Sequence, residues 1–195
     1  YRPDTANEIF FAASTPNIWN ISTYGTPTLV AGVAITSDKF QWVNFTPAQG
    51  ANYLVICNGS DGVWEYNGTS WSQPSITGVN SNSLIHVNVW KRRLWFVQAN
   101  STSVWFLGTD AIQGAATQLD VGAFMTKGGF VTSIANWTVD GGNGPADMLV
   151  IITSRGQCVI YSGTDPTNAN AFSLVGVFDI SVPIGRRNFL RFGSD

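Results

Sequence analysis

The chain has 195 residues, of which 44% are hydrophobic, 13% aromatic and only 11% charged, and its formal net charge is −2. This length supplies the core of one domain, and the weak negative charge excludes bulk electrostatic attraction to nucleic acid or to an anionic membrane. No apolar run is long enough for a transmembrane helix, and no signal-peptide pattern opens the sequence, so we expect no membrane partner. A chain with few charges and many aromatics is expected to bury them inside a β-fold or against partner subunits.

Four unbroken apolar runs mark the first strand of four similar units. Short continuous runs bounded by turn residues are typical of strands that are buried on both faces. The runs cover residues 9–12, 53–56, 94–97 and 148–152.

A turn rich in Gly, Asn, Ser and Asp follows each run, and a second apolar strand then ends at a Gly-Thr corner. Such turn residues accept a positive φ or form Asx-type hydrogen bonds, so the first and second strands are expected to form a hairpin. The second strand carries Trp19, Trp64 and Trp105 at one equivalent position, where the fourth unit has Val159 and Ile160 instead. Because aliphatic residues replace the indole there, the position is expected to pack between repeats rather than to stack on a sugar.

A third apolar run follows a variable loop, and a fourth run closes each unit. The third runs cover residues 28–33, 75–79, 118–121 and 172–177, and the fourth cover 40–45, 84–89, 131–139 and 188–192. The Gly-Thr corners recur at intervals of about 40–55 residues, which is typical of the four-stranded blades of a β-propeller. We predict an all-β, β-propeller-like repeat of four-stranded antiparallel blades with almost no helix, in one domain over residues 1–195.

The repeat units are predicted at about residues 9–45, 52–89, 94–139 and 148–192. Either these four blades close on themselves or they belong to a larger propeller or a longer chain. The second arrangement is favoured because Gly193 to Asp195 stand where a turn into a fifth first strand is expected, and because the chain begins with Tyr1 rather than Met.

The residues that catalysis usually needs are scarce. The one histidine, His86, lies in an alternating run that is typical of a strand, and the only glutamates are Glu8 and Glu65. These residues provide no nucleophile with an adjacent base and no pair of carboxylates with a defined separation. We therefore expect no enzymatic activity.

Metal, cofactor and disulfide chemistry is not expected either. One histidine cannot build a Cys/His zinc site, and the loop 140–147 has acids only at its two ends, without the alternating ladder of a calcium loop. Cys57 and Cys158 lie in apolar runs at different positions of their units, so we expect two buried free thiols.

Two clusters contain six of the ten basic residues: Lys91, Arg92 and Arg93, and Arg186, Arg187 and Arg191. They are expected near comparable edges of neighbouring blades, where they are either solvated turns or a basic patch that faces DNA phosphates or a neighbouring subunit. A separate candidate is Trp71, which lies in a polar loop and is predicted to make an exposed aromatic contact.

Several motifs of the second half of the chain carry a family resemblance. They are Trp-Lys-Arg-Arg-Leu-Trp-Phe-Val at 90–97, Gly-Thr-Asp at 108–110 with Gly-Ala-Ala-Thr at 114–117, Lys-Gly-Gly at 127–129, Gly-Thr-Asp-Pro at 163–166 and Pro-Ile-Gly-Arg-Arg at 183–187. With these motifs the chain resembles the β-propeller tail nozzle, or packaged-DNA stabilisation, proteins of short-tailed bacteriophages. The resemblance covers about residues 53–195.

The resemblance implies a structural role in the virion. Several copies, six in the relatives, form a ring around the tail channel, retain packaged DNA, and dock the tail adaptor and the fibre or spike proteins. It implies no catalytic residues and leaves open a non-specific contact between DNA and the basic patch. The alternative from the residues alone is a carbohydrate-binding propeller, based on the aromatic content and Trp71. A propeller hydrolase is a weaker third reading, since His and Glu are scarce.

Overall fold

The computed structural model describes residues 1–4, 6–140 and 145–190. In this part of the chain the predicted all-β fold is confirmed, since the helical residues form only two short 3₁₀ turns, η1 (Ser81–Ser83) and η2 (Gly122–Phe124). No helix among the described residues is long and apolar enough to cross a membrane.

Four antiparallel sheets contain most of the strands, and we number them in chain order. Each sheet is an antiparallel meander in which each strand pairs with the next strand of its own sheet. Sheet 1 consists of β1 (Phe11–Ser14), β2 (Asn17–Asn20) and β3 (Thr28–Ala34), and sheet 2 of β4 (Gln41–Phe45), β5 (Tyr53–Cys57), β6 (Val63–Tyr66) and β7 (Trp71–Ser72). Sheet 3 consists of β9 (Leu84–Trp90), β10 (Arg93–Gln98), β11 (Ser103–Phe106) and β13 (Thr117–Asp120), and sheet 4 of β14 (Val131–Asp140), β15 (Pro145–Thr153), β16 (Gln157–Gly163) and β17 (Phe172–Asp179).

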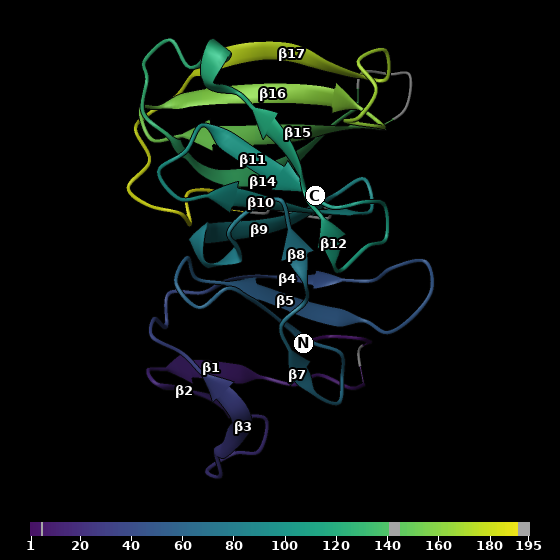
Figure 1. The fold of residues 1–195 in the computed structure, drawn as a ribbon, viewed down its shortest axis with the longest axis vertical. Helices are drawn as coiled ribbons and strands as arrows, with labels where there is room; N and C mark the ends of the chain where they lie inside the picture. The colour runs from purple at the N-terminus through teal and green to yellow at the C-terminus, as the bar shows by residue number, and fades with distance from the viewer. Residues whose placement is uncertain (5, 141–144, 191–195) are drawn as a thin grey trace.

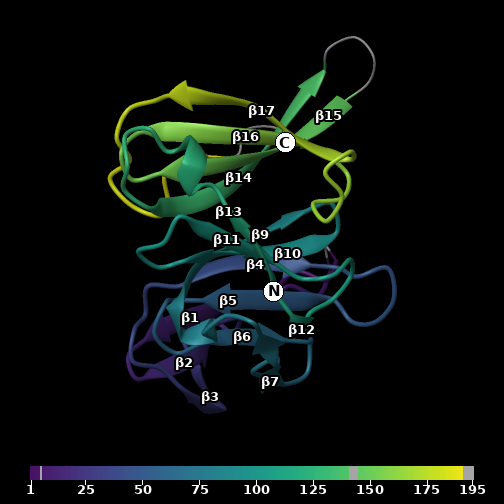
Figure 2. The same ribbon diagram turned by 45° about the horizontal axis from the view of Figure 1, so that its top comes forward.

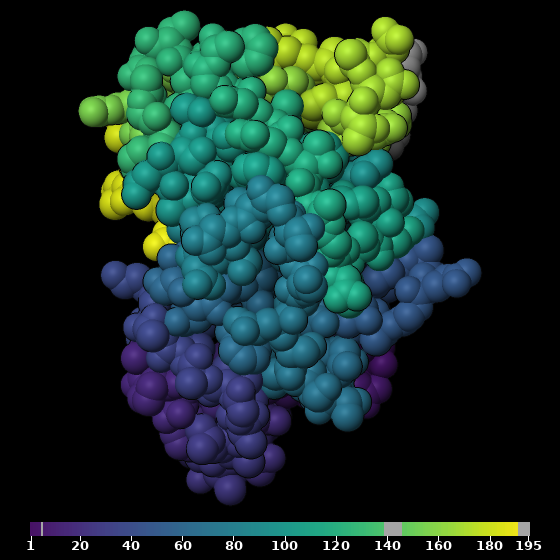
Figure 3. Space-filling view, viewed as in Figure 1, coloured from purple at the N-terminus to yellow at the C-terminus, as the bar shows by residue number. Residues whose placement is uncertain are grey.

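The sheets follow one another in chain order along the longest axis of the molecule. Figures 1 and 3 show sheet 1 in purple at one end and sheet 4 in green and yellow at the other, and the turned view of Figure 2 keeps this order. Sheets 2, 3 and 4 contact one another through their first strands, because β9 touches both β4 and β14. We call β4, β9 and β14 the inner strands.

Each gap between neighbouring sheets holds its own hydrophobic core. Ile18 and Ile56 pack between sheets 1 and 2, Phe45 and Phe96 between sheets 2 and 3, and Trp95 with its neighbours between sheets 3 and 4. A strand can serve two such cores because its side chains alternate between the two faces of the sheet. Sheets 2 and 3 are accordingly covered on both faces, which explains their unbroken apolar runs.

The hairpin predicted between the first two strands of each unit is confirmed in all four units, and its register repeats. Ala12 lies opposite Trp19, Ile56 opposite Trp64, Phe96 opposite Trp105, and Ile151 opposite Val159. The tryptophans therefore occupy one structural position, which the fourth sheet fills with Val159. This shared register also lets equivalent residues of different sheets be compared.

The hydrogen-bonded sheets are offset by one strand from the units read in the sequence. The run that was expected to close each unit is the inner strand of the following sheet: β4 pairs with β5, β9 with β10, and β14 with β15. A repeat has the same period whichever strand is counted first, so periodicity alone does not reveal this phase. As a consequence, sheet 1 has three strands and no inner strand among the described residues.

Two other runs also differ from expectation. The third run of the second unit contains only β8 (Ile76–Thr77), which forms a short parallel pair with β12 (Gly114–Ala115) of the next unit, while β7 takes the outer place in sheet 2. Of the last run, Asn188 to Leu190 form no strand, and Arg191 and Phe192 lie outside the described residues, as do Gly193 to Asp195. Residues 141–144 of the loop 140–147 also lie outside the described part.

Candidate functional site

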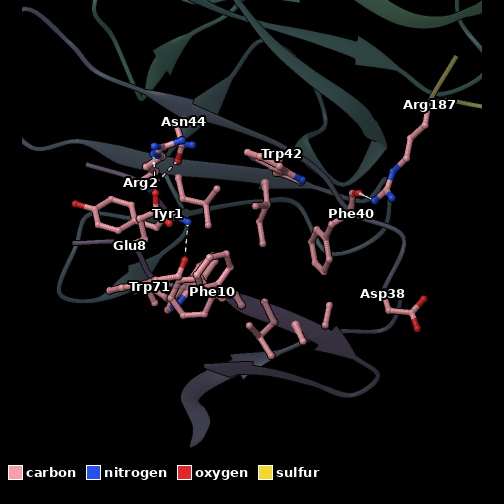
Figure 4. Close-up of a pocket in the computed structure, with 17 residues that line it drawn as sticks. Tyr1, Arg2, Glu8, Phe10, Asp38, Phe40, Trp42, Asn44, Trp71 and Arg187 are labelled. Atoms are coloured by element: carbon pink, nitrogen blue, oxygen red, sulfur yellow. Dashed lines mark hydrogen bonds and ion pairs between the residues drawn. The ribbon is translucent and has the colours of Figure 1, made fainter. Parts of the chain in front are cut away.

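A hollow of about 480 Å³ lies between sheets 1 and 2. Its walls are mainly aromatic and aliphatic side chains of β1, β4 and β5 (Figure 4). Tyr1, Arg2 and Glu8 lie at one end and Arg187 and Asp38 at the other.

The hollow lies at the edge of sheet 1 where the other three sheets have an inner strand and the described residues provide none. Trp42, Val87 and Ile134 occupy one position of the three inner strands, opposite Ile56, Phe96 and Ile151 respectively, and they point toward the preceding sheet. Val87 and Ile134 are 3% and 0% exposed, whereas Trp42 is 60% exposed. Among the described residues, the indole of Trp42 therefore lacks the cover that the inner strand of the preceding sheet gives to Val87 and Ile134.

Tyr1 pairs with the chain just before β1, at one end of the hollow. Its amino group donates to the carbonyl of Ile9 at 2.9 Å, and the Ile9 N–H donates to the Tyr1 carbonyl at 3.0 Å, as in an antiparallel pair. By register, Tyr1 is equivalent to the aromatic residues at the corresponding place in the inner strands, Phe45, Trp90 and Trp137. Its ring packs edge-on against Tyr66 of sheet 2 at 5.1 Å.

The edge of β1 that faces the hollow carries unpaired backbone groups. The Phe10 carbonyl accepts from Ile21 on the β2 side, whereas Ile9 pairs with Tyr1 on the other side. Because hydrogen-bonding directions alternate along a strand, the N–H and C=O groups of Phe11 and Ala13 point into the hollow. This edge has room for another strand.

The charges around the hollow already have partners or lie in solvent. Arg2 forms an ion pair with Glu8 at 2.8 Å, and its backbone N–H donates to Asn44. Burial lowers the pKa of the Tyr1 amino group, against the opposing effect of Glu8. At the far end, Arg187 donates to the carbonyl of Phe40 at 2.9 Å, which Figure 4 shows as a dashed line. The hollow therefore suits an uncharged occupant better than an anion or a cation.

Trp71, the predicted exposed aromatic contact, lies on the wall of this hollow and is half-buried. Its ring packs against Phe11 at 5.0 Å and Tyr66 at 5.4 Å, so little of its surface remains free for a ligand. The sequence could not show this because Phe11 comes from another sheet. Trp42 is the more exposed aromatic side chain of the hollow.

The first basic cluster lies at the turn between β9 and β10, and each of its side chains is paired with an aspartate. Lys91 pairs with Asp147 at 3.1 Å, Arg92 with Asp110, and Arg93 with Asp165 at 3.2 Å. Lys91 and Arg92 hold the pKa of Asp147 and Asp110, respectively, below the usual range by hydrogen bonding. The positive charge of this cluster is thus largely compensated locally.

Two arginines of the second cluster, Arg186 and Arg187, together with Asn188, hydrogen-bond to residues in or beside sheets 2, 3 and 4. We call these three residues the arginine clasp. Arg186 donates to the carbonyls of Asn58, after β5, and of Ile85, in β9, while Asn188 hydrogen-bonds Thr132 and Ser133 of β14. With the Arg187 bond to Phe40, these residues bind the same end of all three inner strands. Arg191 lies outside the described residues.

The two basic clusters do not meet. Arg186 binds Ile85 near the start of β9, and the Lys91–Arg92 turn follows the other end of that strand. A strand rises about 3.3 Å per residue, so roughly 17–20 Å separate the two sites. They therefore do not form one continuous basic patch.

A carboxylate that the sequence did not single out ties the β5–β6 turn to the connection between β3 and β4. Asp61, in the β5–β6 turn, accepts from the Thr36 N–H at 2.8 Å and hydroxyl at 2.6 Å, from the Ser37 N–H at 3.2 Å, and from the Asn58 amide at 2.6 Å. Burial works to raise the pKa of Asp61, but these hydrogen bonds outweigh it and lower the pKa. The Asn-Gly-Ser-Asp-Gly turn gives a signal for the local bonds only, since Thr36 lies in the connection between β3 and β4.

The remaining reactive groups are buried and dispersed. Cys57 and Cys158 are free and buried as expected, and burial raises the pKa of both thiols, that of Cys158 to about 11. His86 is buried in β9, with its ring 5.9 Å from that of Phe189. Among the described residues no three His, Cys, Asp or Glu side chains come together as a metal site would require.

The hollow is thus lined mainly by apolar side chains, and Arg186 and Arg187 bind backbone carbonyls of neighbouring strands. Comparison with protein-family models and with curated proteins finds no match for this chain.

Proposed function

We propose that this chain is a structural component of a bacteriophage tail, in which the four sheets are blades of a β-propeller and several copies form a ring in the virion. The observation that carries this is the repeated stacking of the sheets, with apolar surface left exposed between sheets 1 and 2 and on sheet 4. Trp42 is exposed beside sheet 1, and Trp137 and Phe178 are about half exposed on sheet 4. Exposed apolar surface of this kind is typical of contacts with other chains.

The proposed role is non-catalytic. Glu65 and His86 are buried within strands, and the exposed carboxylates of Asp110, Asp147 and Asp165 are engaged by the basic cluster. Tail adaptor and fibre or spike proteins are the further partners that the resemblance to nozzle proteins suggests, and a hexamer is the ring order that it suggests.

Electron microscopy and mass measurement of the purified protein, and of particles that carry it, test the proposal. We expect closed rings, six-membered by resemblance, and density for the protein at the tail. Dispersed monomers under assembly conditions, with no density at the tail, would contradict it.

Contact with channel DNA is proposed as weak and salt-sensitive, because the Lys91–Arg93 cluster is compensated by aspartates. Replacement of Lys91 and Arg92 by alanine should reduce retention on a DNA column and flatten its dependence on salt. Arg155→Ala, at the exposed β15–β16 turn, is the control. Equal loss in the control would show a general charge effect rather than a DNA-facing site.

A carbohydrate-binding propeller is the second candidate, and the exposure of Trp42 beside Asn44 favours it. An aromatic face next to amide groups is a common setting for a sugar. Glycan-array binding that is lost in Trp42→Ala but kept in Trp71→Ala would support this candidate. Absence of any glycan affinity in the unmodified chain would exclude it.

A further inference from the structure

We propose that the turn between β6 and β7 is a site of spontaneous covalent modification, at which the Asn67 side chain is deamidated and the backbone isomerised, with water as the co-reactant. A second Asn-Gly pair, Asn58–Gly59 in the β5–β6 turn, is protected by the fold and provides the comparison. The pair at 143–144 lies outside the described residues. This chemistry is independent of the proposed role in a virion.

The reaction is a ring closure between two neighbouring residues. The Gly68 nitrogen loses its proton to hydroxide and attacks the side-chain carbonyl carbon of Asn67, so that a new C–N bond forms. The bond to the side-chain nitrogen breaks, and this nitrogen takes a proton from water and leaves as ammonia. Water then opens the five-membered imide at either carbonyl, which gives aspartate or isoaspartate. Glycine in the second position favours the closure, because it has no side chain to obstruct the approach.

The β6–β7 turn holds the Asn67 amide in a geometry that assists the attack. Its Oδ1 accepts from the N–H groups of Thr69 and Ser70, both at 2.9 Å, in an Asx turn. The attack places negative charge on this oxygen, and two backbone donors at such a distance stabilise that charge as an oxyanion hole does. The turn therefore favours the transition state of ring closure.

The nucleophile and the leaving group in this turn are both free to react. Among the hydrogen bonds of the described residues, none is donated by the Gly68 N–H or by the side-chain nitrogen of Asn67. Both residues are partly exposed, and Thr69 and Ser70 are exposed, so hydroxide and water reach the reacting atoms. Gly68 has a φ of +96°, which side-chain-bearing residues rarely adopt, so the turn itself requires the glycine that the reaction needs.

The Asn58–Gly59 pair has the same two residues in the opposite environment. The Oδ1 of Asn58 also accepts from two backbone N–H groups, those of Ser60 and Asp61. Its side-chain nitrogen, however, donates to the Ser37 carbonyl at 2.7 Å and to Asp61 at 2.6 Å, and the residue is only 2% exposed. Ring closure there requires these bonds to break and water to enter, which takes a local opening of the structure. The two turns therefore differ in the leaving group and in the access of water.

Isomerisation in the β6–β7 turn loosens β7. Isoaspartate adds one carbon to the main chain and a carboxylate at the point where the Asn67 N–H donates to the Ser70 carbonyl at 3.3 Å. β7 follows at once, and its Trp71 packs against Phe11 and Tyr66. The modification therefore acts on the outer strand of sheet 2 and on one wall of the hollow.

Peptide mapping by mass spectrometry in a mildly alkaline buffer tests the proposal, with the folded chain and the chain unfolded in urea followed in parallel. The unfolded chain is the matched control, since it lacks both turns, and it should show similar rates at the two pairs. Folding should slow the reaction at Asn58 by more than about tenfold, because two hydrogen bonds must break first. It should leave the reaction at Asn67 as fast or make it faster. If folding slows the reaction at Asn67, the turn hinders ring closure and the proposal is overturned.

Two variants sharpen the comparison, with circular dichroism to verify the fold. Asp61→Ala removes one acceptor of the Asn58 amide and should raise the rate at Asn58 but not at Asn67; an unchanged rate at Asn58 overturns the protection by Asp61. Asn67→Gln, which would have to close a six-membered ring, should give no product in its peptide, and product there overturns the assignment of the site. The deamidated chain, separated by ion exchange, should exchange the amides of β7 faster than the unmodified chain. Equal exchange overturns the loosening of β7.

Discussion

Sheets 1 and 3 are built from the same hairpin in the same register, yet they differ in how well their side chains are buried. Sheet 3 has an inner strand, β9, and is covered on both faces, so Trp95 and Phe96 are fully buried. Sheet 1 has no inner strand among the described residues, and Phe10, Leu29 and the facing Trp42 are exposed. The comparison teaches that an inner strand completes its own sheet and also covers the face of the next one.

The largest expected effect is seen when two tryptophans are compared, Trp95 in the covered sheet 3 and Trp42 beside the uncovered sheet 1. Trp95→Ala removes a fully buried side chain between sheets 3 and 4 and should lower the free energy of unfolding by about 3–5 kcal/mol. Trp42→Ala, at a position that is 60% exposed, should cost less than about 1 kcal/mol. Urea unfolding monitored by circular dichroism measures both.

A similar loss in the two variants would break the comparison, because it would mean that the hollow is filled in solution. Trp42→Phe, which keeps an aromatic ring, is the control for simple loss of bulk. Its effect should be smaller than that of Trp42→Ala.

The arginine clasp is the second point of contrast, because it holds sheets 2, 3 and 4 and makes no bond to sheet 1 among the described residues. Arg186→Ala leaves the Asn58 and Ile85 carbonyls without their donor and should lower the free energy of unfolding by about 1–3 kcal/mol. Arg187→Ala removes one bond from a more exposed side chain and should cost less. If neither variant is destabilised, the cluster is free for a ligand and its structural role is wrong.

The sequence predicted those features of sheets 1 and 3 that depend on residues close together in the chain. The hairpin turns, the equivalence of Trp19, Trp64 and Trp105, and the free thiols follow from local turn chemistry and apolar runs. The sequence does not show whether β4 belongs to sheet 1 or to sheet 2, because β4 is as near in sequence to β3 as to β5. Only the pairing of β4 with β5 in the folded structure decides this.

The candidate site shows the same limit. The clusters at Lys91 and at Arg186 were both recognisable as basic, but their partners Asp165 and Ile85 are brought in by packing of other elements. The hollow was not predicted at all, because its position depends on the phase of the sheets, which leaves the described residues of sheet 1 without an inner strand. When β4, β9 and β14 are aligned, Trp42 stands at the position of the buried Val87 and Ile134, and its exposure identifies the hollow.

A third prediction concerns Glu65, whose buried carboxyl lies in sheet 2 opposite Val55, on the face that packs on sheet 3. Burial raises its pKa, and the hydrogen bond from Ser72 only partly opposes this. The folded state then binds a proton more tightly than the unfolded state, so this group stabilises the fold below pH 4.5 and loses that contribution as pH rises through the raised pKa. Glu65→Gln should therefore be stabilised relative to the parent at pH 7 and not at pH 4.

Urea midpoints of both proteins across pH 4–7 give the difference curve. The aspartates cancel in this difference because both proteins contain them. A flat curve would mean that the carboxyl is solvated and that the contact between sheets 2 and 3 is looser at this point than the structure has it.

The smallest expected effects come from two ion pairs, one beside sheet 1 and one in sheet 3. The Arg2–Glu8 pair beside sheet 1 has exposed fractions of 61% and 34%, so Arg2→Ala should change the free energy of unfolding by only about 0–1 kcal/mol, and less at high salt. Arg93 in sheet 3 is 13% exposed, donates to the Leu107 carbonyl as well as to Asp165, and lies over the ring of Phe106. Arg93→Ala should cost about 1–2 kcal/mol and depend little on salt, because most of the loss is packing and a buried carbonyl bond. Equal, salt-sensitive losses in the two variants would mean that sheet 3 is no better covered than sheet 1 at this edge.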